Sequence, residues 1–148
     1  MKFKTVILLL LSVIFLISCK KYENGYQKTI SIELVTEGTI HIQNPVFTAT
    51  LYGVDPIVQD VPATKIVSKS FSKNSLPTTI KMEVPRNADQ MIEFKNDDTK
   101  KAYYLNINWD ANNNGQYDKG DIVIDFNRSF PDIDLTKSHQ KIYLRHWE

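Results

Sequence analysis

Apolar and polar residues alternate in several short blocks along this chain. A period of two places successive side chains on opposite faces of an extended strand, so that one face can be buried. In the clearest block, residues 103–109, Asn106 and Asn108 lie between large apolar residues. The pattern predicts strands over residues 30–34, 40–42, 47–51, 80–84, 103–109, 122–126 and 142–144.

Proline, asparagine and glycine separate these blocks, and only residues 87–94 show a weak helical period. Short strands with turn residues between them are typical of an all-β fold. The sequence therefore predicts a single antiparallel β-sandwich, of the immunoglobulin or transthyretin type, over residues 29–148. No internal repeat and no second domain are evident in it.

The first residues have the order of parts that a bacterial secretory signal requires. Lys2 and Lys4 give a positive start, and residues 6–17 form an apolar run broken by a single serine. This run is shorter than the ~20 residues that a membrane-spanning helix needs. Residues 16–19, Leu-Ile-Ser-Cys, match the bacterial lipobox L-[ASTVI]-[GAS]-C, whose cysteine receives covalent lipid.

We therefore predict a lipoprotein signal peptide over residues 1–18, a lipidated Cys19, and a short tether over residues 19–28. The tether reaches about 30 Å at ~3.3 Å per residue, which holds the domain close to a membrane. Cys19 is the only cysteine, so its modification leaves no thiol for a disulfide or a thiolate metal site. The predicted location is the cell envelope, at the outer membrane, with the periplasmic or surface face left open.

The charge balance and the motifs narrow the class of function. The chain has a net charge of +1, and loss of Lys2 and Lys4 with the signal makes the mature chain slightly acidic. Nucleic-acid binding calls for a basic patch or stripe, so we predict no such partner.

The sequence has no G-x-S-x-G, H-E-x-x-H or phosphate-binding glycine loop. A zinc site needs three or four convergent ligands, and the only histidines are His41, His139 and His146. We therefore predict that the chain is not an enzyme.

Residues 110–121, Asp-Ala-Asn-Asn-Asn-Gly-Gln-Tyr-Asp-Lys-Gly-Asp, predict a calcium loop. They fit the pattern D-x-[DN]-x-[DN]-G of a twelve-residue loop through its first six positions. In such a loop, oxygens at alternate positions converge on one ion. The predicted ligands are Asp110, Asn112, Asn114, the backbone carbonyl of Gln116, Asp118 and Asp121.

Two features distinguish this loop from a helical calcium-binding hand. Strands are predicted on both sides of it, which makes it a hairpin, and Asp121 replaces the longer glutamate that usually closes the site. The predicted role of the calcium is structural. The alternative is a solvated turn without an ion, because asparagine, aspartate and glycine populate turns in any case.

Four short motifs carry a resemblance to a known family. They are Thr48-Ala-Thr-Leu51 followed by Asp55, Asp60-Val-Pro-Ala-Thr64, the proline-flanked segment 76–85, and Tyr103-Tyr-Leu-Asn-Ile107. Together they resemble the bacterial lipoproteins called type III secretion lipoprotein chaperones, or pilotins (YscW- and YbaY-type). The resemblance implies a β-sandwich in a lipoprotein that escorts an outer-membrane secretin subunit to its place of assembly. The calcium-like insertion at 110–121 departs from the short hairpin expected in simpler members.

The first functional hypothesis is a membrane-anchored, non-catalytic binding or assembly factor, chaperone- or pilotin-like, of the cell envelope. An exposed strand edge or groove would receive an outer-membrane or secretion-system protein. The alternative is a surface module for carbohydrate or peptide, using the calcium loop and a platform of exposed aromatic residues. The candidates for this platform are Tyr104, Tyr117, Tyr143 and Trp147, although most aromatic residues at strand spacing belong to a core.

Overall fold

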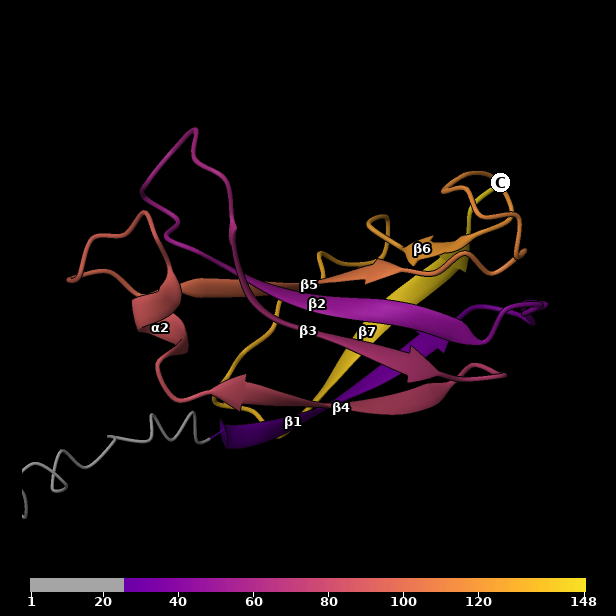
Figure 1. Ribbon diagram of the computed structural model, residues 1–148, viewed down its shortest axis with the longest axis horizontal. Coiled ribbons are helices and arrows are strands. Elements are labelled where there is room, and N and C mark those ends of the chain that lie inside the picture. The colour runs from indigo at the N-terminus through magenta and orange to yellow at the C-terminus, as the bar shows by residue number, and fades with distance from the viewer. Residues whose placement is uncertain (1–25) are drawn as a thin grey trace, which may run out of the picture.

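The computed structural model describes residues 26–148, in which seven strands form two sheets packed face to face (Figure 1). The predicted signal, Cys19 and most of the tether lie outside the described residues. Sheet A has the order β4-β1-β7-β6 and sheet B the order β3-β2-β5, which confirms an all-β sandwich. Among residues 26–148, no helix has the length and hydropathy to cross a bilayer. The strands are β1 (Tyr26–Thr36), β2 (Val46–Val54), β3 (Thr64–Ser72), β4 (Thr78–Pro85), β5 (Ala102–Asn108), β6 (Ile122–Ile124) and β7 (His139–His146), and the short helix is α2 (Ala88–Met91).

The core lies between the two sheets and follows the alternation of the sequence. In β4, for example, Ile80, Met82 and Val84 are buried while the residues between them are exposed. At the centre, Trp109 is fully buried and stacks on Phe47 with ring centroids 4.2 Å apart. Its indole N–H donates a hydrogen bond of 2.8 Å to a backbone carbonyl, so this large side chain leaves no buried donor unpaired.

One strand pair departs from the antiparallel prediction. β7 runs parallel to β1, with Ser31 opposite His139 and Thr36 opposite Leu144. A parallel pair needs a long connection. Here almost the whole described domain is that connection, because β1 and β7 are its first and last strands.

One predicted boundary and two predicted elements differ from the structure. β1 begins at Tyr26, so the last residues of the predicted tether are part of the sheet. The helical period over residues 87–94 gives only the four residues of α2. Residues 40–42 are not a strand, because this segment crosses from sheet A to sheet B. Its apolar residues Ile40 and Ile42 pack against the core without strand pairing.

β3 was not predicted as a strand because its alternation is weak. It is the last strand of sheet B, and Ile66 is its only fully buried residue. Serines and lysines occupy most of the other positions. An edge strand can stay polar on both faces because less of it is covered, so periodicity gives little signal there.

The two sides of the sandwich end differently, and this difference determines which surfaces are open. On one side the edge of β5 is covered by the segment 130–133: the Leu105 N–H donates to the Pro131 carbonyl at 2.9 Å, and the Ile133 N–H donates to the Tyr103 carbonyl at 2.8 Å. On the other side, β3 and β4 end their sheets, with no further strand beyond them among residues 26–148 (Figure 1).

Candidate functional site

The predicted calcium loop lies between β5 and β6, and the structure brings most of its predicted ligands together. The Asp110 carboxylate accepts the backbone N–H groups of Asn114 at 3.1 Å and Gly115 at 2.9 Å. The side-chain amide of Asn114 donates to both oxygens of Asp118, at 3.0 and 3.2 Å. Asn112 donates to the same carboxylate at 3.4 Å. Gly115 has a φ of +77°, as the sharp turn at the sixth position requires.

Asp121 closes the loop from the inside of the protein. Its side chain is fully buried and accepts the backbone N–H of Ala111 at 3.2 Å and that of Asp118 at 3.1 Å. Burying a carboxylate is costly unless hydrogen bonds or a cation compensate its charge. The bond from Ala111 joins the beginning of the loop to its end, and the bond from Asp118 closes its last turn, so Asp121 organises the loop whether or not an ion binds.

The donor set is chemically suited to calcium, which prefers carboxylate and amide oxygens. In the present arrangement, however, the amide nitrogens of Asn112 and Asn114 face Asp118. Among residues 26–148, no three histidine, cysteine, aspartate or glutamate side chains converge as metal ligands. To hold a cation, both amides would have to present their oxygens instead, a rotation that keeps the same shape of side chain. The Asn114 side-chain oxygen already accepts a hydrogen bond, from the N–H of Gln116 at 2.8 Å. Because the amides of the loop are arranged for hydrogen bonds among its own residues, the calcium ion stays a prediction.

The loop is tied to the end of β7. The Gly120 N–H donates to the carbonyl of Trp147 at 2.9 Å, and the Trp147 N–H donates to the carbonyl of Asp121 at 2.8 Å. The rings of Tyr117 and Trp147 lie 5.1 Å apart. Stabilising the loop would therefore also stabilise the corner that β6 and β7 form.

A second polar cluster, centred on the buried Asp55, was not singled out as a site from the sequence. Its carboxylate accepts the Thr99 hydroxyl at 2.5 Å, the N–H groups of Asn96 at 2.7 Å and Ile57 at 3.2 Å, and the Lys101 ammonium at 3.1 Å. The Thr99 hydroxyl, and then the backbone N–H groups and Lys101, hold the pKa of Asp55 well below its usual range against the opposing effect of burial. In the sequence, Asp55 appears in the first of the four family motifs, and as an aspartate before a proline at a strand end, which is typical of a turn.

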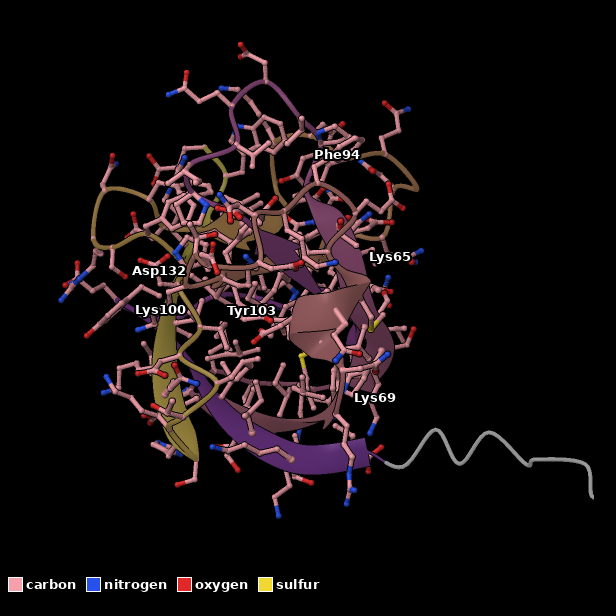
Figure 2. The ribbon with its side chains drawn as sticks, turned by 90° about the vertical axis from the view of Figure 1, so that its left-hand side faces the viewer. Lys65, Lys69, Phe94, Lys100, Tyr103 and Asp132 are labelled. Carbon is pink, nitrogen blue, oxygen red and sulfur yellow. The ribbon has the colours of Figure 1, made fainter. Side chains whose placement is uncertain are left out.

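Two donors to Asp55, the side chains of Thr99 and Lys101, line a cleft of about 750 Å³ at the end of the sandwich that carries α2. Val84, Ala88 and Tyr103 contribute apolar surface to it. Charged residues of both signs surround it, among them Lys100 and Asp132, which Figure 2 shows around the opening beside Tyr103.

The Tyr103 hydroxyl donates to the Asp89 carboxylate. Burial and then this negatively charged neighbour raise the pKa of Tyr103, so the phenol stays protonated at any physiological pH. The pair fixes α2 against β5 and defines one corner of the cleft. The Tyr103–Asp89 pair therefore has a structural role, as a hydrogen bond that holds the helix in place.

The histidines do not form one site. His41 and His146 line a second hollow of about 670 Å³. His139 lies elsewhere, with its Nε2 3.9 Å from a carboxylate oxygen of Glu33 on the exposed face of sheet A.

The predicted aromatic platform divides into separate parts. Tyr117 and Trp147 form the pair beside the calcium loop, and Tyr143 lies under the guanidinium of Arg128, 4.7 Å from its ring centroid. Tyr104 belongs to a different group, in which it contacts aromatic residues from β2 and from the segment after β6. The members of this group that the sequence did not indicate are Tyr52, Phe126 and Phe130.

No family model matches this chain, and no curated protein matches it. Among solved structures, the fold is similar to one described as an alternative pilotin from the type II secretion system of Vibrio cholerae. The sequence identity is 16%, the alignment covers 79% of this chain and 94% of that chain, and the TM-score is 0.49. At this level the likeness concerns the course of the backbone alone, and membership of the YscW- and YbaY-type family stays a prediction.

We predict that Asp55→Asn lowers the stability of the fold at neutral pH and weakens its dependence on pH. Because the pKa of Asp55 is lower in the folded state than in the unfolded chain, the ionised carboxylate stabilises the fold above about pH 5. This contribution is lost as the pH falls below about 4. Urea unfolding of the wild type and the variant, from about pH 7 to pH 3, measures the free energy of unfolding across this window.

The two curves should converge as the pH falls. Thr99→Val, which removes the hydroxyl that lowers the Asp55 pKa most, should act in the same direction. Thr79→Val, at an exposed position of β4, is the matched control. Curves that stay parallel over the whole range would contradict this role of Asp55.

Proposed function

We propose that this chain is a membrane-anchored, non-catalytic lipoprotein of the cell envelope that binds a partner protein and assists its assembly. The lipobox around Cys19 supports the anchor. The observation that carries the binding role is the edge of β3, nine residues long, with which no further strand pairs among residues 26–148. α2 and β4 lie beside β3, and the Glu93 N–H donates to the Thr64 hydroxyl at its beginning at 3.0 Å.

An unpaired strand edge presents a row of backbone N–H and carbonyl groups that can pair with a strand of another protein. β3 also has two features that limit indiscriminate pairing. Lys69 is exposed but lies opposite the buried Ala49, on the side of the strand that faces the core. The register of β2 and β3 shifts between Leu51 and Tyr52. Lysines and irregularities of this kind protect edges against self-association, so a partner must fit the edge specifically.

The position of this edge suits a partner in the same membrane. The described chain begins at Tyr26, opposite Pro85 at the end of β4, which is the other free strand on this side. From a lipid on Cys19, the chain to Tyr26 spans at most about 25 Å. The resemblance to pilotins points to an outer-membrane or secretion-system protein as the partner class, and the side of the membrane is left open.

The anchor predicts that Cys19→Ser abolishes incorporation of labelled palmitate, because the thiol is the acceptor of the lipid. Ser18→Ala is the matched control, since alanine also satisfies the lipobox at that position. Metabolic labelling followed by immunoprecipitation separates the two variants. Label retained in Cys19→Ser would refute the anchor.

The binding role predicts that a photo-reactive amino acid at Ser70, an exposed position of β3, cross-links to a discrete envelope protein in living cells. The same amino acid at Lys141, exposed on β7 in sheet A, is the control. Adducts are detected by mass shift and identified by mass spectrometry. Absence of an adduct at Ser70, or the same adduct from both positions, would exclude strand addition at β3.

We further propose a structural calcium ion in the loop 110–121, supported by the spacing of its oxygen ligands. With 1 mM calcium and a dissociation constant of ~10⁻⁴ M, binding would add about 1.4 kcal/mol to the free energy of unfolding. Denaturant unfolding in calcium and in EDTA measures this gain. Asp118→Asn should remove it, while Asp132→Asn, outside the loop, should retain it. Equal stability with and without calcium, and no heat on titration, would end the proposal.

A further inference from the structure

The outer faces of the two sheets differ in charge. On sheet A, the outward positions of β1, β4 and β7 carry charged residues in alternation with the buried ones. The Lys141 ammonium lies 3.6 Å from a carboxylate oxygen of Glu33 there. This is the ordinary character of a solvated sheet face. The charged residues of this face are Glu33, Lys81, Glu83, Lys141 and Arg145.

The middle of the outer face of sheet B consists of neutral polar residues. Because Phe47, Ala49 and Leu51 of β2 are buried in the core, the residues between them point outward. Two rows cross the sheet there, one from Ser70 to Asn108 and the next from Ser68 to Asn106. We call these six residues the neutral face: Thr48, Thr50, Ser68, Ser70, Asn106 and Asn108.

The hydroxyl groups of this face are ordered by one another. Those of Thr50 and Ser68 lie 2.9 Å apart, and those of Thr48 and Ser70 lie 3.3 Å apart. Each hydroxyl has one donor and two acceptor sites, so such pairs keep hydrogen-bonding capacity for a ligand. Thr50 is only 8% exposed, so in its pair the exposed Ser68 is the residue that a ligand can reach. Two charges of opposite sign end the following row: Lys65 lies opposite Tyr52, and Asp132 lies opposite Tyr104.

A row of aromatic rings adjoins the neutral face. Tyr52 and Tyr104 stack across β2 and β5, with centroids 5.5 Å apart and planes 18° from parallel. Phe130 follows at 5.9 Å from Tyr104, and Phe126 at 6.0 Å from Phe130. The side chains of Phe126 and Phe130 are 63% and 56% exposed. We call these four residues the aromatic row. A contiguous exposed group of this kind marks a binding surface.

We propose that the neutral face and the aromatic row together bind a neutral oligosaccharide. A sugar ring presents an apolar C–H face, which packs on aromatic rings, and hydroxyl groups, which pair with serine, threonine and asparagine side chains. The neutral face has no charged side chain, and the next row has one lysine and one aspartate, so the surface has no excess of positive charge. This favours a neutral ligand over an acidic polymer, which would call for lysine or arginine at the contact. This inference rests on outward side chains of sheet B and on two phenylalanines after β6, and it requires neither the anchor, nor strand pairing at the β3 edge, nor a calcium ion.

The test uses the full chain, purified in lauryldimethylamine oxide so that no sugar-based detergent competes. Isothermal titration calorimetry is run with cello-, malto-, xylo- and mannohexaose, and with the hexamer of polygalacturonate as an acidic probe. At least one neutral hexasaccharide should bind, and the acidic probe should bind more weakly than it. Phe126→Ala and Phe130→Ala should each weaken this binding by roughly tenfold, since each removes one ring contact.

Two comparisons make the result specific to sheet B. Both phenylalanines are largely exposed, so their variants should keep the melting temperature of the wild type. Tyr143→Ala, on the outer face of sheet A, is the matched aromatic control and should leave the affinity unchanged. Three results would overturn the proposal: no binding of any neutral probe, tighter binding of the acidic probe, or equal affinity in the wild type and both phenylalanine variants.

Discussion

The packing of two apolar sheet faces against each other is the interaction on which every other feature depends. Residues 26–148 contain no cysteine, so no disulfide supports this packing. The inner face of β1 contributes Ile30, Ile32 and Leu34, all fully buried, and sheet B opposes it with the stacked pair of Phe47 and Trp109. Burial of such side chains contributes roughly 1.5–3 kcal/mol each before the entropy of ordering the chain is subtracted. The loops that carry polar chemistry are placed only because this core fixes the strands at both of their ends.

The polar groups then divide the surface into regions with different tasks. Asp55 gathers donors from the segment between α2 and β5 and holds that segment over one end of the sandwich. Asp121 does the corresponding work at the other end, inside the loop that joins β5 to β6. Between these ends, sheet A has a charged outer face and sheet B a neutral one. A small domain can thus present an edge, a face and a loop as separate binding surfaces without any of them disturbing the core.

Sequence periodicity predicted the strands that bury one complete face, because alternation reports burial directly. It predicted β4 and β5 well, and it failed at β3, where an edge strand buries little and lysines and serines hide the pattern. It also mistook residues 40–42 for a strand, since the half-buried Ile40 and Ile42 alternate without pairing. The parallel pairing of β1 with β7 could not be inferred, because it joins segments more than a hundred residues apart. Local spacing indicated the 110–121 loop, whereas the aromatic row draws on three separate segments, and only the tertiary fold brings them together.

The parallel neighbourhood of β1 and β7 has a mechanical consequence. Their pairing runs from Ser31 opposite His139 to Thr36 opposite Leu144, so the entry of β1 and the exit of β7 lie at opposite ends of the pair. A pull between these two points slides one strand along the other and loads all the intervening backbone hydrogen bonds at once. Opening them one by one, as in a hairpin pulled from its free ends, would need less force. A domain built in this way resists traction between its first and last strands, whichever molecules it joins.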